Sequence, residues 1–215
     1  MPKALIPLGS RPLVAWSMIA LASCDAIDGI VLAAPTGQEI PMRMAVGEAG
    51  GEGLIVVSGG ASRQRSVQAA LAAVPDDAAY ILVHDAARPL VTAELCIALL
   101  AALDGAEGAI VATPVADTLK RAGEDMVITE TVDRAELWQA QTPQAFHADV
   151  LRHAFATATD QELDTSTDCA SMVQALGGRV RLVATASPNL KVTTPADLIV
   201  AEHLLRAVGR IASES

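Results

Sequence analysis

The amino-acid sequence predicts an α/β fold in which helices cover a mostly parallel, doubly wound sheet. Short apolar segments alternate with helical patterns along most of the chain, the order that a parallel sheet with crossover helices requires. Hydrophobic residues make up 52% of the chain but aromatic residues only 2%, so the core must consist of Ala, Val, Leu and Ile. A length of 215 residues favours a single domain spanning 1–215.

Five apolar segments are predicted to be strands. Each is short and is followed by a turn or by polar residues; the first, for example, stops at Pro35. The five segments span 29–34, 53–57, 79–84, 108–112 and 180–184.

Helical patterns lie between and around these strands. The segment at Thr92 begins with a capping residue, followed by Glu94 and a face of Leu, Ile and Ala. The helical segments span 12–22, 66–73, 92–103, 166–176 and 195–208. Ligands bind beyond the carboxyl ends of the strands in such sheets, so the candidate binding loops follow Val57, His84, Ala112 and Ala184.

One segment, 115–146, breaks the alternation because it is polar and rich in Thr. Two extended stretches, 117–121 and 128–132, flank a Gly-containing turn at 122–125 and predict a β-hairpin. A hairpin alone is marginally stable, so we expect an arm that packs on something else, such as another subunit.

Composition narrows the class of protein. A formal charge of -10 argues against a general nucleic-acid binder, although a few cations in one cleft can still bind a small anion. The three cysteines show no metal-binding or disulfide spacing and are expected to be buried thiols in a reducing cytoplasm. No apolar run approaches the roughly 18 residues of a membrane span, and no signal peptide opens the sequence, so we expect a cytoplasmic protein.

Asp85 and Arg88, directly after the third predicted strand, form the strongest local motif. The carboxylate can accept hydrogen bonds from ribose hydroxyls or hold magnesium, directly or through water, and the guanidinium can bind a phosphate. The alternative is a local Asp–Arg pair that closes the loop. His84 is expected to be a strand-end residue with a satisfied ring rather than a general base.

Other motifs are weak when taken singly. Paired glycines at 59 and 60 let backbone amides approach a base or a phosphate, and Ser66 follows at a helix start. Lys191 could place an ammonium on a phosphate, although a lone Lys usually faces solvent. The hydroxyls before the helix at 166–176 could hold an anion or simply cap the helix.

These motifs occur in one order along essentially the whole chain, and in that order the sequence resembles the 2-C-methyl-D-erythritol 4-phosphate cytidylyltransferases of non-mevalonate isoprenoid synthesis. The ordered set is Pro2-Lys3, Gly59-Gly60 to Ser66, His84 to Pro89, Asp117 to Lys120, Thr131 to Arg134, Thr142-Pro143-Gln144, Thr167-Asp168 and Leu190 to Thr193. The resemblance implies a Rossmann-like nucleotidyltransferase with a protruding arm that builds a homodimer. It also implies the reaction: cytidylyl transfer from CTP to 2-C-methyl-D-erythritol 4-phosphate with release of pyrophosphate.

The resemblance assigns a role to each matching residue. Lys3 and Lys191 are implied to be catalytic. Ala61 stands where several family members have Asp, so any base contact there is expected through its backbone. Thr118 and Arg134 are implied to reach the neighbouring subunit's cleft. The implied nucleotide-binding residues are Gly60, Ala61, Ser66, Asp85 and Ala86. The implied substrate-binding residues are Asp85, Arg88, Thr118, Arg134, Thr167 and Lys191.

The implied chemistry needs cations and positioning rather than a covalent nucleophile. The attacking phosphate is already deprotonated near neutral pH, so no general base is required. Magnesium is expected to be bound mainly by the CTP phosphates and water, with no metal ligand from the protein.

The match fails at the start of the sequence. Family members begin with a strand and an Ala-Ala-Gly-x-Gly-x-Arg loop before the Pro-Lys element, whereas this sequence opens Met1-Pro2-Lys3. We therefore expect that this strand, loop and arginine are lacking, either because the sequence starts too late or because the protein is a non-catalytic nucleotide-binding relative. The first interpretation is favoured because the downstream site positions are kept. Another polyol phosphate, such as ribitol 5-phosphate, is the alternative acceptor.

Overall fold

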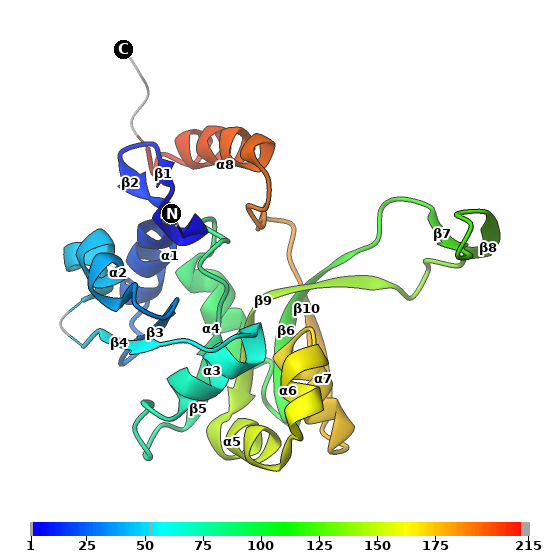
Figure 1. Cartoon of the computed structure of the whole chain (residues 1–215), viewed down its shortest axis with the longest axis horizontal. Coiled ribbons are helices and arrows are strands. Elements are labelled where there is room, and N and C mark those ends of the chain that lie inside the picture. The colour runs from blue at the N-terminus through cyan, green and yellow to red at the C-terminus, as the bar shows by residue number, and fades with distance from the viewer. Residues whose placement is uncertain (1, 52, 212–215) are drawn as a thin grey trace.

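The computed structural model describes residues 2–51 and 53–211 (Figure 1). Its strands are β1 (Pro7–Leu8), β2 (Arg11–Pro12), β3 (Val31–Ala34), β4 (Ile55–Ser58), β5 (Tyr80–Val83), β6 (Gly108–Pro114), β7 (Leu119–Ala122), β8 (Ile128–Val132), β9 (Trp138–His147) and β10 (Val180–Ala184). Its helices are α1 (Leu13–Ala22), α2 (Glu39–Val46), α3 (Arg63–Leu71), α4 (Ala93–Ala101), α5 (Ala148–Thr157), α6 (Asp160–Thr165), α7 (Cys169–Ala175) and α8 (Pro195–Ala207), with short 3-10 turns η1 (Lys3–Leu5) and η2 (Gly47–Gly50). All five predicted strands and all five predicted helices are present, and all but the strand at 180–184 have shifted ends.

A mixed sheet of four strands, in the order β10-β6-β9-β5, forms the centre of the molecule. β10 pairs with β6 in parallel, whereas β9 runs antiparallel to both β6 and β5. The predicted α/β class is confirmed, but the central sheet is mixed because β9 enters it in the opposite direction.

β9 is the main correction to the prediction, which placed this part of the chain in the arm. Residues 142–146 of β9 are buried in the sheet, so the arm is shorter than the expected 115–146. The strand is hidden in the sequence because two of its buried side chains, Thr142 and Gln144, are polar. Each is hydrogen-bonded inside the protein, which removes most of the cost of burying it.

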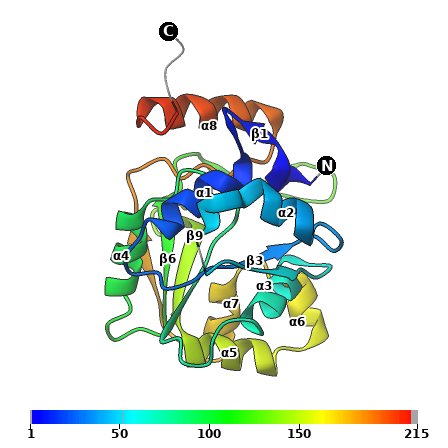
Figure 2. The same cartoon turned by 90° about the vertical axis from the view of Figure 1, so that its left-hand side faces the viewer.

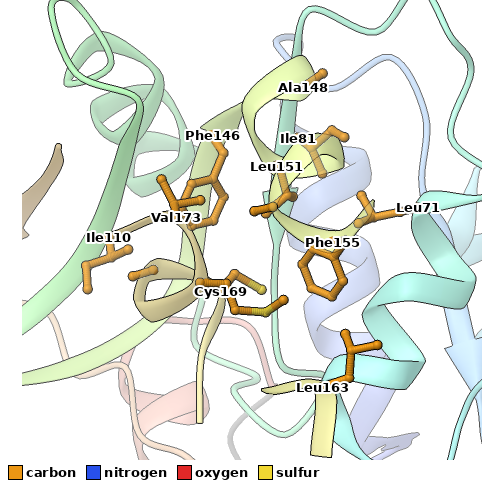
Figure 3. Close-up of a cluster of buried hydrophobic side chains, with 13 residues drawn as sticks. Leu71, Ile81, Ile110, Phe146, Ala148, Leu151, Phe155, Leu163, Cys169 and Val173 are labelled. Atoms are coloured by element: carbon orange, nitrogen blue, oxygen red, sulfur yellow. The ribbon is translucent and has the colours of Figure 1, made fainter. Parts of the chain in front are cut away.

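Helices cover both faces of this sheet, and the period-two alternation of strand side chains decides which residues meet which helix. Ile110 and Phe146 pack on the side of α5 and α7, where Leu151 and Val173 belong to the same buried cluster (Figure 3). Ala109, Ala145 and their neighbour Val111 pack on the opposite side, against α4. The core is therefore built mostly from small and aliphatic residues, as the composition indicates.

β3 and β4 form a separate parallel pair. Within the described residues, no ladder joins this pair to the four-stranded sheet, so β3 and β5 each keep an unpaired edge. Helix α1 packs on both pieces (Figure 2): Val14 and Met18 share a cluster with Ala34 of β3, and Ala20 shares another with Leu82 of β5.

The predicted hairpin is formed by β7 and β8, which pair in antiparallel fashion. Figure 1 shows it standing away from the body of the protein, beyond the ends of β6 and β9. All residues of β7 are exposed, and so are the apolar side chains of Met126, Val127 and Ile128 at the turn and in β8.

The remaining expectations about residue environment concern thiols and membranes. Cys24, Cys96 and Cys169 are free and buried, as predicted. Among the described residues, no helix is both long and apolar enough to cross a bilayer.

Candidate active site

Asp85 lies at the centre of the candidate site, just beyond the end of β5. Its carboxylate accepts from Arg63 Nε at 3.1 Å through Oδ1 and pairs with Lys191 Nζ at 2.7 Å through Oδ2. Burial alone would raise the pKa of this carboxyl, but the hydrogen bond from Lys191 and the charge of Arg63 outweigh it and lower the pKa to about 2. Asp85 is therefore ionised and holds two cations at the edge of the sheet.

Arg88 lies in the same loop but is buried rather than open to solvent, with 9% of its surface exposed. Its Nη1 donates to the backbone carbonyl of Asn189 at 2.6 Å, and the backbone N–H of Val192 donates to the carbonyl of Ala87 at 2.8 Å. These two bonds fasten the loop that carries Lys191 onto the loop that carries Asp85. The Nε of Arg88 is buried and has no hydrogen-bond partner within the described part of the chain.

His84 is a satisfied strand-end residue, as predicted. The backbone N–H of Asp85 donates to Thr142 Oγ1 at 3.0 Å, so the Thr142 hydroxyl is free to donate to His84 Nδ1 at 3.3 Å. The ring then donates from Nε2 to the carbonyl of Arg88 at 3.1 Å. Burial lowers the pKa of His84 to about 4, which agrees with the neutral ring that these bonds require.

The glycine turn after β4 is shaped by Ser66. Its Oγ accepts from the N–H of Gly60 at 3.1 Å and donates to the carbonyl of Ser62 at 3.0 Å. A Cβ at Gly60 would lie 2.4 Å from the Cβ of Arg65, so a larger residue cannot occupy this position without movement. Ser66 thus holds the turn in shape, and Ala61, next to Gly60, is exposed at its tip.

A buried polar network behind the site joins segments that are distant in the sequence. Gln64, fully buried, donates to the carbonyl of Asp168 at 2.8 Å. Gln144 donates to the carboxylate of Asp168 at 2.9 Å and accepts from the N–H of Cys169 at 3.1 Å. Thr167 is exposed next to Asp168, so this network fixes the loop before α7 against the glycine turn and β9.

Several residues of this framework carry no predicted role from the sequence. Arg63 and Gln64 lie inside the glycine motif and Gln144 inside the Thr-Pro-Gln motif, so the motifs contained the signal. Their function depends on contacts between distant segments, which one sequence does not show.

Three predicted site residues are not brought to Asp85. Lys3 is exposed in η1, and among the described residues its ammonium has no hydrogen-bond or ion-pair partner. Thr118 and Arg134 are exposed and flank the arm hairpin, which stands apart from the body in Figure 1. Ala86, in contrast, lies next to Asp85 and packs against the cluster that contains Ala34.

The donor set of the site does not form a protein metal centre. Both carboxylate oxygens of Asp85 are engaged by cations. Across residues 2–51 and 53–211, no group of three or more His, Cys, Asp or Glu side chains lies close enough to hold a metal ion.

A glycine turn, a carboxylate and several cations at the ends of strands in an α/β fold suit a phosphorylated nucleotide. The same fold occurs in the crystal structure of 2-C-methyl-D-erythritol 4-phosphate cytidylyltransferase from Thermus thermophilus, with a TM-score of 0.81 and 36% sequence identity over 95% of this chain and 94% of that one. Fold and site thus define a nucleotidyltransferase.

The family model described as IspD, 2-C-methyl-D-erythritol 4-phosphate cytidylyltransferase, matches residues 1–207. The chain belongs to this family of cytidylyltransferases, which act in non-mevalonate isoprenoid synthesis.

Relatives of the same name are similar over nearly their full length. The 2-C-methyl-D-erythritol 4-phosphate cytidylyltransferase of Parasynechococcus marenigrum (strain WH8102) is 42% identical over 206 residues, which cover 94% of this chain and 89% of the relative. That of Haemophilus influenzae (strain PittGG) is 39% identical over 204 residues, 95% of this chain and 88% of the relative. These names give no support to a ribitol phosphate acceptor or to a non-catalytic relative.

Proposed function

We propose that this chain carries out the reaction of its family, transfer of the cytidylyl group of CTP to 2-C-methyl-D-erythritol 4-phosphate, at the loops after β4, β5 and β10. The observation that carries the proposal is the ionised Asp85 between Arg63 and Lys191, with Arg88 behind it. This arrangement combines a carboxylate for hydroxyl groups with cations for phosphates.

Each part of the site has a proposed task. Gly60, Ala61 and Ser66 bind cytosine through the backbone of the glycine turn, and Asp85 and Ala86 bind the ribose. Lys191 and Lys3 stabilise the negative charge of the reacting phosphates. The remaining substrate contacts come from Asp85, Arg88, Thr118, Arg134, Thr167 and Lys191.

The reaction needs no covalent enzyme intermediate. A phosphate oxygen of the acceptor forms a bond to the α-phosphorus of CTP as the bond to the bridging oxygen of pyrophosphate breaks. Cations around the α-phosphate stabilise the negative charge of this transition state. When bound through the triphosphate and water, Mg²⁺ would supply positive charge that stabilises the leaving pyrophosphate.

The arm supports a homodimer. Thr118 and Arg134 lie beside a hairpin that stands away from its own site, so a second copy is the site that they can reach. Exposed apolar side chains at Leu119, Met126 and Ile128 give the arm an apolar surface that a second copy can bury. Sedimentation of the full chain at the mass of one copy would contradict this assembly and the tasks of both residues.

The proposed compartment is the cytoplasm, and each copy is proposed to fold as a single domain, 1–215. The three buried free thiols suit a reducing environment, and a net charge of -10 argues against a general nucleic-acid binder.

Pyrophosphate release from CTP with 2-C-methyl-D-erythritol 4-phosphate and MgCl₂ tests the proposal. Replacing Lys191 with Met removes one cation beside the reacting phosphates and should lower kcat/KM by roughly 100-fold. Arg181→Met is the matched control, because Arg181 is an exposed cation on β10, the strand that leads to Lys191.

Ribitol 5-phosphate serves as the comparison acceptor in the same assay. Preference for it would refute the proposed substrate. A chain that releases no pyrophosphate with either acceptor would refute the catalytic proposal, and equal losses in Lys191→Met and Arg181→Met would refute the task of Lys191.

A further inference from the structure

The two cations on Asp85 differ in how firmly they are held. Lys191 has 41% of its side chain exposed, and its ammonium contacts Asp85 from a flexible stem. Arg63 has 27% exposed and donates in three directions: from Nε to Asp85, and from Nη1 to Gln64 Oε1 at 2.8 Å and Cys169 Sγ at 3.7 Å. Arg63 is therefore held by three partners, whereas Asp85 is the one partner of the Lys191 ammonium among the described residues.

The two residues that accept from Nη1 of Arg63 are themselves buried. Gln64 is fully buried and donates to the carbonyl of Asp168, and Cys169 is buried at the start of α7. Arg63 begins α3, directly after the capping residue Ser62, so its backbone is also held. A lysine at this position could not make both the Asp85 and the Gln64 contacts, because its single ammonium lacks the fork of a guanidinium.

The number of cations that contact Asp85 decides what happens when one of them leaves. The charged groups around its carboxylate are Arg63, Arg88 and Lys191, beside the neutral ring of His84. Arg88 has its Nη1 committed to the Asn189 carbonyl. If Lys191 leaves Asp85 for a phosphate, Arg63 is the direct partner that remains. A carboxylate with only 16% of its side chain exposed would otherwise be left without a direct countercharge, which is costly.

We propose that Arg63 is a positioning residue: it keeps Asp85 paired so that Lys191 can exchange its contact with Asp85 for a contact with a ligand phosphate. The inference rests on the proposed function, because the phosphate is taken to be that of a substrate. Without Arg63, the lone carboxylate of Asp85 retains Lys191, and the phosphate loses a cation.

A double-mutant cycle on kcat tests the exchange. Arg63→Gln is expected to lower kcat by roughly tenfold to 100-fold, and Arg63→Lys to recover part of that loss. Adding Lys191→Met to Arg63→Gln should cost little more, because Lys191 is already withdrawn from the phosphate. Additive losses, or no recovery in Arg63→Lys, would overturn the inference.

Arg65→Gln is the matched control. Arg65 lies two residues along the same helix and forms exposed ion pairs with Asp160 and Asp164, so its loss should leave kcat within about twofold of the unchanged protein. Thermal unfolding of every variant shows whether α3 is still folded. A drop in kcat that parallels the drop in melting temperature across these variants would mean a structural role and overturn the inference.

A second measurement does not depend on turnover. The chain has three lysines, Lys3, Lys120 and Lys191, so their side-chain NMR signals can be assigned by substitution. CTP added without acceptor should move the Lys191 signal in the unchanged protein and move it much less in Arg63→Gln at the same occupancy. An unmoved Lys191 signal in the unchanged protein would overturn the inference. A moved signal without pyrophosphate release would refute the proposed function and leave the exchange standing.

Discussion

The neutral ring of His84 predicts a specific loss of stability in mild acid. Burial lowers the pKa of His84 from 6.5 to about 4, and in the unfolded chain the ring returns to its ordinary pKa. The folded state therefore binds fewer protons than the unfolded state between these two values. The stabilisation is fully present above the unfolded pKa and is lost as the pH falls towards the folded pKa.

The magnitude follows from the two pKa values. Between about pH 7.5 and about pH 5, this one ring should reduce the free energy of unfolding by about 2 kcal/mol. Asp85 contributes little to the change in the free energy of unfolding over this pH range, because its pKa is lowered to about 2 and the carboxyl stays ionised. The physical reason is burial of the ring, which disfavours its charged form.

Urea unfolding at the two pH values, with and without the substitution His84→Gln, measures the effect. The variant should be less stable near pH 7.5 but lose about 2 kcal/mol less than the unchanged protein on acidification. His153→Gln, at an exposed position on α5, should keep the slope of the unchanged protein. If His84→Gln and the unchanged protein lose the same free energy, the ring is not held neutral and the assigned hydrogen bonds are wrong.

Two further predictions concern stability alone. A Cβ at Gly108 would lie 2.6 Å from the ring of Phe146, its partner across β6 and β9. Gly108→Ala should therefore lower the free energy of unfolding, measured by chemical denaturation, by about 1–3 kcal/mol. An unchanged denaturation midpoint would mean that the ring can move aside. Thr194 caps α8 by accepting from the N–H of Asp197 at 3.3 Å. Thr194→Ala should therefore lower the free energy of unfolding by about 1 kcal/mol, and Thr194→Ser should lower it less. Equal losses in the two variants would show that the hydroxyl does not stabilise the helix.

The sequence predicted the elements whose patterns are local. The parallel strands are short apolar runs, and the hairpin has a Gly-containing turn, so each was found. Helix α6 also carries a local signal, the capping box from Thr159 to Glu162, and α5 carries an apolar stripe at Leu151, Ala154 and Phe155. Both helices were predictable, but neither was predicted.

β9 and the framework of the site were not predictable in the same way. Gln144 is polar in the sequence and becomes a core residue because Asp168 and Cys169, more than twenty positions away, satisfy its amide. Arg63 was one of two arginines in the glycine motif, and only the rotation of α3 shows which of them faces Asp85. The roles of Lys3, Thr118 and Arg134 remain predictions, because they depend on ligands or on a second copy.

The candidate site lies between two separate sheets, the β3–β4 pair and the four-stranded sheet. The glycine turn belongs to the β3–β4 pair and Asp85 to the four-stranded sheet, and within residues 2–51 and 53–211 no backbone ladder fixes one to the other. Their spacing is set by the packing of α1, by the ion pair from Arg63 to Asp85, and by the buried hydrogen bonds from Gln64 and Gln144 to Asp168. A nucleotide that contacts both sheets links them, so part of its binding free energy is used to reduce their motion relative to each other.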